Sequence, residues 1–375
     1  MKIFFLNSHP IEYFSDMYKY LTNEKIDIEV WYCSKFGTKN YHDKEFNNIR
    51  KVDGLLDGFN HKFLLNINPF TNAKEKLFDT INPLLFMNLL KLNRKDIIIC
   101  HGWSRISMIS VIILSKFMGF KVGIRCETPL SHEKNYVGFR KYLRKNILKL
   151  LFKLTDYFFY IGTNNYNFYK EFGIGDDKLI FMPYSVKPKN NDYEYRHKNN
   201  TILFCGKLID KKRPIDLLEA FSLIENKNSK LYFAGNGVQK ELLISKSIEF
   251  GIKDRVMFLG LQDRVSLDKL YSKADVLVLP SGYGETWGLV INEGLEWGTP
   301  VVISDMVGCA NDLCQGNGYV FQYKNVEDLV LKLKNIYNMS DEEYQSLVIN
   351  SHRAKNKFSF NKITLNLTRF IKQNS

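Results

Sequence analysis

The 375-residue sequence lacks several features that would place it quickly in a common protein class. It has no uninterrupted apolar run near the roughly 18 residues that a membrane-spanning helix needs. Its six cysteines include no C-x-x-C pair, which argues against a structural zinc site. The N-terminal apolar run, IFFL, is too short for a secretory signal peptide. We therefore expect a globular, cytoplasmic protein whose thiols are reduced.

Motifs for binding nucleotides, metals and nucleic acids are also missing. No G-x-x-x-x-G-K-[ST] sequence occurs, which excludes a P-loop nucleoside triphosphatase. Gly235-x-Gly237 follows an apolar run, but Lys240 stands where the dinucleotide-binding fingerprint needs a third glycine. No D-x-D motif, which often holds a divalent cation, is present. No nucleic-acid-binding signature is found either, so we expect neither a bound metal nor a nucleic-acid partner.

Acidic residues are outnumbered by basic ones. The 53 Lys and Arg residues exceed the 40 Asp and Glu residues, which gives a net charge of +13. Such an excess indicates a phosphorylated or polyanionic partner, or an anionic membrane surface. The alternative is a lysine-rich composition without specific meaning.

Short apolar runs recur along the chain and alternate with amphipathic segments. Helical periods cover, for example, residues 105–118 and 164–172. Runs typical of buried strands cover residues 2–7, 27–33, 96–101, 121–126, 157–162, 201–206, 230–235, 255–260, 274–280, 299–304 and 319–322. This alternation predicts an α/β protein with two Rossmann-like domains facing a cleft, with ligands bound beyond the carboxyl ends of the strands.

A polar segment divides the two series of strands. Residues 186–200, VKPKNNDYEYRHKNN, contain almost no aliphatic side chains and read as an interdomain linker. We expect an N-terminal domain over residues 1–185 and a C-terminal domain over residues 201–355. Residues 356–375 are predicted to form a helix that packs back on the N-terminal domain.

The stretch SGYGETWGLVINEGLEWGTPVV, residues 281–302, carries two glutamates around a predicted helix start. Its glycines permit a tight turn, and the free amides of a helix beginning near Thr286–Gly288 would form an anion site suited to a diphosphate. If both Glu285 and Glu293 were helical, about 12 Å would separate them along the axis. Each carboxylate could then bind hydroxyls at one end of a sugar–diphosphate–ribose ligand. The alternative is a helix start with favourable acidic charge.

Two lysines follow the first strand of the second series. Lys207 and Lys212 are expected at the carboxyl edge of the sheet, where they could neutralise a leaving diphosphate. Taken alone, they could equally be two surface lysines.

Together with FCGKLIDKKRPIDLLEAF, AGNG, RVMFLG and ADVLVLPS, these motifs resemble glycosyltransferase family 4. The resemblance covers the second domain fully and the first more loosely, and it implies that residues 201–355 form a nucleotide-sugar-binding domain and residues 1–185 an acceptor-side domain. It implies the GT-B fold and a retaining, metal-independent enzyme that uses a UDP- or GDP-linked sugar as substrate and no cofactor.

The resemblance also implies residue roles. Glu293 would bind the ribose, and Glu285 the donor sugar and its transition state. The remaining donor-binding residues would be Lys207, Lys212, Thr286, Trp287, Gly288 and Leu289. Lys207 departs from the arginine usual at its position, which keeps the charge but loses the bidentate geometry.

The first domain contributes further candidates. His101 ends the predicted strand of DIIICHGWS and resembles the active-site histidine of the family. The glycine-rich loop usual after the first strand is replaced by NSHPIEYF, as in a bacterial subgroup. Acceptor-side candidates are therefore His9, Glu12, Tyr13, Arg125 and Glu127. A structural role for a lone histidine is the alternative.

Residues 138–158 predict a basic amphipathic helix. Lys141, Lys145, Lys149 and Lys153 recur every four residues. The interleaved apolar residues are expected to pack inward and the lysines to face an anionic membrane. An ordinary surface helix is the alternative. The apolar residues in question are Phe139, Leu143, Ile147, Leu150, Leu151 and Leu154.

These observations predict an enzyme that transfers a sugar to a glycan or lipid-linked acceptor in bacterial surface-polysaccharide biosynthesis, such as lipopolysaccharide or capsule. It would lie at the inner face of the cell membrane as a peripheral protein. A nucleotide-sugar epimerase of similar fold and a non-catalytic nucleotide-sugar-binding protein remain as alternatives.

Overall fold

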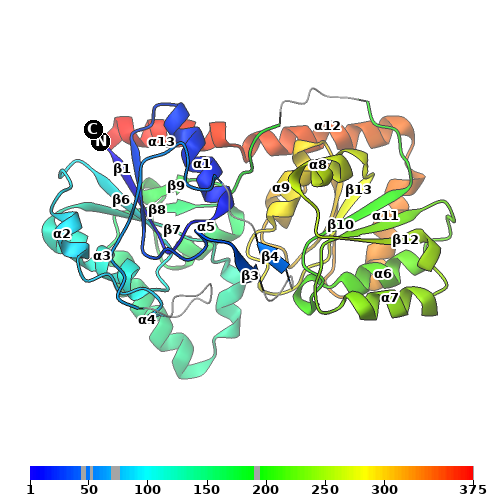
Figure 1. Cartoon of the computed structure of the whole chain (residues 1–375), viewed down its shortest axis with the longest axis horizontal. Coiled ribbons are helices and arrows are strands. Elements are labelled where there is room, and N and C mark those ends of the chain that lie inside the picture. The colour runs from blue at the N-terminus through cyan, green and yellow to red at the C-terminus, as the bar shows by residue number, and fades with distance from the viewer. Residues whose placement is uncertain (44–47, 51–53, 69–76, 190–194, 375) are drawn as a thin grey trace. The chain divides into compact units, whose positions relative to one another are not determined.

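The computed structural model describes residues 1–43, 48–50, 54–68, 77–189 and 195–374. The chain divides into two compact units (Figure 1). Unit 1 comprises Met1–Tyr41, Arg50–Lys187 and Ser359–Ser375, and unit 2 comprises His42–Ile49 and Pro188–Phe358. Of the predicted linker, residues 190–194 lie outside the described residues.

Unit 1 is built on a parallel sheet with the strand order β5-β2-β1-β6-β7-β8-β9. The predicted strands are present, and the edge strands β5 and β9 are additions that the apolar pattern did not predict. The strands are β1 (Ile3–Asn7), β2 (Ile28–Tyr32), β5 (His61–Phe63), β6 (Ile97–His101), β7 (Lys121–Arg125), β8 (Tyr157–Tyr160) and β9 (Leu179–Phe181).

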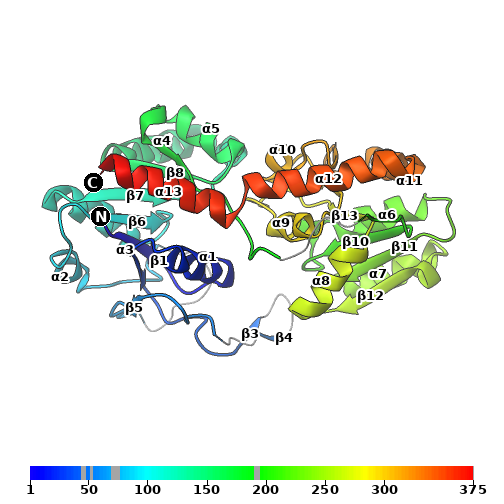
Figure 2. The ribbon, with the colours of Figure 1, turned by 90° about the horizontal axis from the view of Figure 1, so that it is seen from above.

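Helices cover both faces of this sheet. Alternate residues of each strand point to opposite faces, so both faces carry apolar side chains that helices bury. Phe4, Ile98 and Val122 share one core cluster with residues of α2–α5. On the other face, Phe5 contacts Tyr18 of α1, and α1 packs against α13 (Figure 2). The helices are α1 (Glu12–Asn23), α2 (Leu85–Leu89), α3 (Ile106–Met118), α4 (Gly138–Lys153), α5 (Thr163–Glu171) and α13 (Phe360–Asn374).

The α13 helix follows all of unit 2 in the sequence but belongs to unit 1. Its Phe370 packs against Tyr157 and Phe159 of β8, with ring centroids 4.8 and 5.6 Å apart. Its Phe360 lies 5.4 Å from Tyr20 of α1. Aromatic packing therefore fixes both ends of this helix to unit 1.

Unit 2 has a second parallel sheet, with the order β12-β11-β10-β13-β14-β15. Strands β13 and β14 are buried along their whole length, which explains their uninterrupted apolar sequences, VLVL and VVIS. Helices α6–α12 belong to the same unit. The strands are β10 (Thr201–Cys205), β11 (Lys230–Ala234), β12 (Val256–Gly260), β13 (Val276–Leu279), β14 (Val301–Ser304) and β15 (Gly318–Phe321).

The helices of unit 2 are α6 (Pro214–Ser222), α7 (Lys240–Glu249), α8 (Arg264–Lys273), α9 (Leu289–Glu296), α10 (Ala310–Leu313), α11 (Val326–Asn338) and α12 (Asp341–Lys357). The short strands β3 (Tyr41–Asp43) and β4 (Asn48–Arg50) pair separately. In the described residues, no helix is both long enough and apolar enough to cross a membrane.

The segment that leads into β10 makes many hydrogen bonds with the rest of unit 2, and Arg196 makes several of them. The guanidinium of Arg196 donates hydrogen bonds to the carbonyl oxygens of Trp297, Tyr271 and Ala274. Part of the predicted linker is therefore hydrogen-bonded to unit 2.

Candidate functional site

The strand order of unit 2 places the predicted donor-site residues together. The chain leaves β10 toward β11 on one side and leaves β13 toward β14 on the other, so β10 and β13 flank the topological switch point. In open parallel sheets, ligands bind beyond the carboxyl ends of the strands at such a point. Lys207 and Lys212 follow β10, and Glu285 follows β13.

The loop after β13 is held by a backbone hydrogen bond and by close packing at Gly282. The Gly282 amide donates to the Lys211 carbonyl at 2.9 Å, which joins the loops that follow β13 and β10. A Cβ on Gly282 would lie 2.4 Å from the Tyr323 hydroxyl, so a side chain there would displace the Tyr323 ring. These contacts fix the backbone on which Glu285 stands.

Lys212 and Glu285 form an ion pair across the switch point. Both side chains are mostly buried, with 17% and 11% of their surfaces exposed. A paired cation and carboxylate at a sheet edge offer one group for phosphate oxygens and one for sugar hydroxyls. Lys207 lies in the same loop after β10 and is partly exposed.

Glu293 lies on α9 and both of its carboxylate oxygens accept hydrogen bonds. Arg264 donates to Oε1 at 2.7 Å, and the Tyr271 hydroxyl donates to Oε2 at 2.7 Å. Tyr271 is fully buried, so its hydroxyl is fixed, whereas Arg264 is partly exposed. A carboxylate has about four lone-pair sites, so acceptor capacity remains for ligand hydroxyls.

Sequence reasoning missed Arg264 and Tyr271. Both lie on α8, seven positions apart in the sequence, which places them on the same face of that helix. That spacing was the available signal, but the sequence does not show that this face meets α9.

The helix after the glutamate turn begins later than predicted. Residues 286–288 precede α9, which starts at Leu289 with Gly288 as its N-cap at φ 102°. Glu285 is therefore not helical, and the expected separation of about 12 Å along one axis does not apply. The N-cap residue, Gly288, has no side chain that could accept from the first-turn amides.

The predicted donor residue Trp287 points away from solvent. Its side chain is 3% exposed, its Nε1 donates to Asn292 at 2.8 Å, and its ring packs on Phe358. Only the backbone of Trp287 is therefore placed to meet a ligand. Thr286 is partly exposed beside it.

In unit 1, His101 and Arg125 are register partners at the carboxyl ends of β6 and β7. The Tyr18 hydroxyl lies 3.2 Å from His101 Nε2 and accepts a hydrogen bond from Asn7 at 2.8 Å. Burial, followed by the positive charge of Arg125, holds the pKa of His101 well below its usual value. The imidazole is therefore neutral at physiological pH. One of its ring nitrogens can donate a hydrogen bond, and the other can accept one.

Arg125 is enclosed by aromatic rings. Its guanidinium carbon lies 4.9 Å from the Phe14 ring centroid and 4.6 Å from that of Tyr184. The Tyr184 hydroxyl donates to Glu127 at 2.9 Å and lies 3.5 Å from that of Tyr13. Tyr13, Arg125 and Glu127, predicted as acceptor-side residues, are thus joined through Tyr184.

The other two acceptor-side candidates, His9 and Glu12, lie where the chain passes from β1 to α1. His9 follows β1, with Nδ1 2.9 Å from the Ser8 hydroxyl and its ring 5.3 Å from Phe36. Glu12 is exposed in the first turn of α1. The strands β1 and β6 flank the switch point of this sheet, so His9 and His101 end neighbouring strands.

The prediction for α4 is wrong in one respect. Phe139, Leu143, Ile147 and Leu150, expected to pack inward, are 76%, 48%, 56% and 64% exposed. Leu151 and Leu154 do pack on the core as predicted, together with Leu148 and Phe152, which were not predicted. The helix has enough apolar residues for two faces, and sequence periodicity does not show which face meets the sheet. Lys141, Lys149 and Lys153 are exposed, and Lys145 pairs with Glu171 at 3.1 Å.

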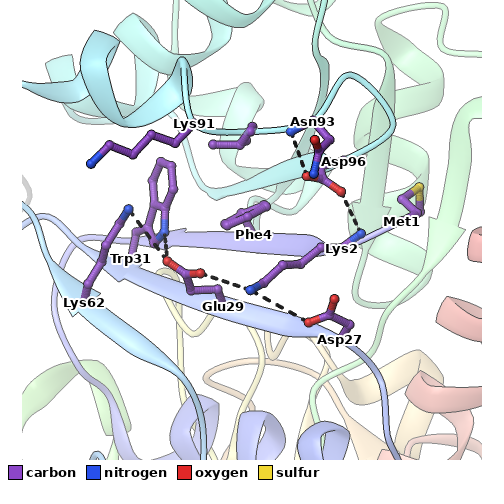
Figure 3. A pocket seen from close by; sticks show the side chains of 11 residues that line it. Met1, Lys2, Phe4, Asp27, Glu29, Trp31, Lys62, Lys91, Asn93 and Asp96 are labelled. Atoms are coloured by element: carbon purple, nitrogen blue, oxygen red, sulfur yellow. Dashed lines mark hydrogen bonds and ion pairs between the residues drawn. The ribbon is translucent and has the colours of Figure 1, made fainter.

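A cavity of about 490 Å³ lies at the opposite, amino-terminal edge of the unit 1 sheet (Figure 3). Its charged lining is internally bonded. Glu29 accepts from Trp31 at 2.8 Å and pairs with Lys2 at 3.1 Å, and Asp96 accepts from the Lys2 and Asn93 amides at 2.9 Å. It includes none of the predicted site residues, so we assign it a structural role.

No group of three or more His, Cys, Asp or Glu side chains in the described part of the chain is arranged to hold a metal ion.

Two parallel-sheet α/β domains, with polar residues gathered at switch points, define the fold class of the GT-B glycosyltransferases. The structure of the Anabaena protein Alr3699/HepE in complex with UDP matches the chain with a TM-score of 0.74 and 14% identity, over 100% of both chains. This likeness confirms the GT-B fold.

Residues 186–354 match the family model of the Glycosyl transferases group 1. An uncharacterized glycosyltransferase of Methanocaldococcus jannaschii is 32% identical over 43% of this chain and 42% of its own length. An alpha-1,4-N-acetyl-D-galactosaminyltransferase of Campylobacter jejuni, named as acting on a diphospho-undecaprenol-linked glycan, is 25% identical over 63% of this chain and 65% of its own. The chain thus spans less than two thirds of each relative. These matches support a group 1 glycosyltransferase and hence a transferase enzyme.

Proposed function

We propose that the protein is a retaining glycosyltransferase that moves a sugar from a UDP- or GDP-linked donor to a glycan or lipid-linked acceptor. The pathway would be the biosynthesis of a bacterial surface polysaccharide, and the protein would act in the cytoplasm. Retention of configuration rests on the resemblance to glycosyltransferase family 4, and no divalent cation is required in this proposal.

The Lys212–Glu285 pair at the switch point carries the donor half of the proposal. Lys212, with Lys207 in the same loop, would bind the diphosphate and stabilise the negative charge that grows as it leaves. The uncapped first turn of α9 would add amide donors to the phosphate oxygens. Glu293, oriented by Tyr271 and Arg264, would accept hydrogen bonds from the ribose diol.

Glu285 would bind the donor sugar. Its carboxylate could accept hydrogen bonds from sugar hydroxyls and stabilise positive character at the anomeric carbon as the glycosidic bond breaks. Neutral His101, at the carboxyl edge of the unit 1 sheet, would exchange a hydrogen bond with a sugar hydroxyl, because its low pKa keeps the imidazole uncharged.

The lipid-linked acceptor is supported by the names of two relatives. One is the Campylobacter jejuni transferase described above, and the other is an alpha-1,3-N-acetylgalactosaminyltransferase of the same organism, 22% identical over 52% of this chain and 54% of its own length; both are named as acting on undecaprenol-diphosphate-linked sugars. The aromatic and charged group around Tyr184 would belong to the acceptor side in this proposal.

The proposal is tested by a thermal-shift screen against a panel of UDP- and GDP-linked sugars, followed by transfer assays with the donor that binds. A donor at 100 times its dissociation constant should stabilise the folded state by about 2.7 kcal/mol. Release of nucleoside diphosphate with retention of the anomeric configuration in the product would support the transferase.

Two alternatives give different results in the same assays. A nucleotide-sugar epimerase would change the sugar while leaving it attached to the nucleotide. A non-catalytic binding protein would be stabilised by the donor but release no nucleoside diphosphate, even slowly to water.

A further inference from the structure

An exposed tyrosine stands two residues before Glu285. Tyr283 is 47% exposed, although Gly282 is buried and the Glu285 side chain is only 11% exposed. Strand β13 ends at Leu279, so Tyr283 lies beyond the carboxyl end of that strand, where ligands of parallel sheets bind. Tyr283 is therefore placed beside the candidate donor-site residues and contributes little to the core.

The chain around Tyr283 forms a tight turn. The Glu285 amide donates to the Gly282 carbonyl at 3.2 Å, which closes a β-turn with Tyr283 and Gly284 at its centre. Gly284 has φ 93°, as the third residue of a type II turn requires. Tyr283 occupies the second position, at the corner of the turn, and its exposure shows that the turn presents this side chain to solvent.

Neighbouring side chains hold the turn on both sides of Tyr283. A Cβ added to Gly284 would lie 3.4 Å from Lys211 Cε. A Cβ added to Gly282 would lie 2.7 Å from the Tyr323 ring. Lys211 is exposed and Tyr323 is partly exposed. An ammonium group and a phenol, which both form hydrogen bonds, therefore flank the turn that carries the exposed aromatic ring.

An aromatic ring with polar neighbours fits a pyranose sugar. One face of many pyranose rings consists of C–H groups that pack on an aromatic ring, while the hydroxyls at the rim reach hydrogen-bonding groups. A tyrosine also loses little conformational entropy on binding, because its side chain has few torsions. A purely apolar ligand would gain nothing from the lysine ammonium and the phenol beside this ring.

The order of the groups along the chain indicates which sugar binds here. In the proposed donor complex, the ribose lies at Glu293, the diphosphate at the first turn of α9 and at Lys212, and the donor sugar at Glu285. The α9 helix follows Glu285 in the sequence, whereas Tyr283 precedes it. Tyr283 thus extends the series of donor groups past the donor sugar.

We propose that Tyr283 binds the acceptor by stacking on one of its sugar rings, so that unit 2 contributes a sugar subsite of its own. This assignment rests on the proposed function, because the order of the donor groups is taken from it. Lys211 and Tyr323 would form hydrogen bonds with hydroxyls at the rim of the stacked ring.

The test is saturation-transfer NMR of the full chain, titrated with the methyl α-glycosides of glucose, galactose, mannose and N-acetylgalactosamine as probes. No donor is present, so the result does not depend on sugar transfer. Tyr283→Phe keeps the ring, and Tyr283→Leu keeps apolar bulk without the ring. Tyr195→Leu is the control, because Tyr195 is another exposed tyrosine of unit 2, at 53%. Thermal unfolding of each variant checks that the fold is retained.

We expect the parent, Tyr283→Phe and the control to bind at least one of these glycosides, and Tyr283→Leu to bind it at least about fivefold more weakly. An excess of the donor that binds in the thermal-shift screen should leave the glycoside bound, because the donor sugar occupies the neighbouring position at Glu285. Absence of glycoside binding by the parent, unchanged binding by Tyr283→Leu, or displacement by the donor would overturn the proposal.

Transfer assays separate this result from that of the proposed function. Tyr283→Leu should raise the KM for the acceptor at least about fivefold and change the KM for the donor little. The reverse pattern would assign Tyr283 to the donor sugar and overturn the proposal. Glycoside binding that depends on Tyr283, in a chain that transfers no sugar, would overturn the proposed transferase and retain the sugar subsite.

Discussion

Glu285 and Glu293 are held in different ways, although both lie near the carboxyl edge of the same sheet. Glu285 stands on a glycine turn and pairs with a lysine. Glu293 stands on a helix and is bonded through both oxygens to α8. The first arrangement ties a carboxylate to the cation expected to bind phosphate, and the second fixes a carboxylate rigidly. The two side chains are therefore expected to differ in function.

We predict that Glu293→Gln weakens binding of the free nucleoside diphosphate, because a charge-assisted hydrogen bond to the ribose is lost. The expected loss is about 1.5–3 kcal/mol, or roughly ten- to a hundredfold in affinity. Glu285→Gln should instead lower turnover strongly and leave that affinity nearly unchanged. Calorimetry with the nucleoside diphosphate and turnover with the full donor measure the two effects. Glu219→Gln, at an exposed position on α6, is the control. Equal losses of affinity with normal turnover would contradict the division of roles.

Tyr271 is predicted to act as a positioning residue for Glu293. Tyr271→Phe removes the hydroxyl that fixes Oε2 and should raise KM for the donor several-fold while changing kcat little. Tyr344→Phe is a matched control, because it removes another buried tyrosine hydroxyl bond, to the Asp275 carbonyl at 3.2 Å. Both variants should lose about 1 kcal/mol of stability. A donor KM that rises equally in both would show that the effect is only structural.

At the scale of single elements, the sequence predicted strands better than the faces of helices. The central strands are apolar throughout because they are buried on both sides, so their positions follow from composition. The edge strands β5 and β9 have three residues each; β5, HKF, has no comparable run, whereas β9 lies in the apolar run LIFM, which was not read as a strand. The α4 helix was oriented only partly right because its apolar residues occupy two faces: Leu151 lies on the inner face as predicted, beside Leu148 and Phe152, which were not predicted. The α8–α9 contacts join residues 22 and 29 positions apart, which no local pattern specifies.

The start of α9 gives a prediction at this scale. Gly288 has φ 102°, and a Cβ there would lie 2.8 Å from Leu279 Cδ2 and 3.1 Å from Val307 Cγ1. Gly288→Ala should therefore add a steric clash to backbone strain. Gly251→Ala isolates the strain, because its φ is 68° and nothing lies within 4 Å of the added Cβ. We expect about 1–2 kcal/mol of destabilisation at Gly251 and more at Gly288. Urea unfolding measures both, and equal losses would show that the surroundings of Gly288 relax.

At the scale of the whole molecule, the repeated strand–helix alternation was enough to predict two parallel-sheet domains. Their strand orders came from the structure, and these orders explain why the candidate residues gather at particular edges. The sequence placed Lys212, Glu285 and Glu293 near one edge, but it did not show the ion pair or the two groups that hold Glu293. The candidate site was therefore predicted as a set of residues and not as a geometry.

Sugar transfer is predicted to need no divalent cation, because Lys207, Lys212 and the α9 amides would neutralise the leaving diphosphate. Excess chelator should leave the initial rate of the full chain nearly unchanged, and added Mg²⁺ should not raise it more than about twofold. A Lys212→Gln variant that becomes dependent on Mg²⁺ would support the same assignment. Complete loss of activity with chelator, restored by metal, would contradict it.

The return of α13 to unit 1 affects how the protein is made. Because the ribosome builds the chain in sequence order, all of Pro188–Phe358 is synthesised before α13 can cover β8 and α1. Until then Phe159 and Tyr20 lack the aromatic partners that α13 supplies. In nascent unit 1, the apolar face of β8 and α1 that α13 later covers is therefore still exposed. Exposed apolar surface of this kind is bound by chaperones.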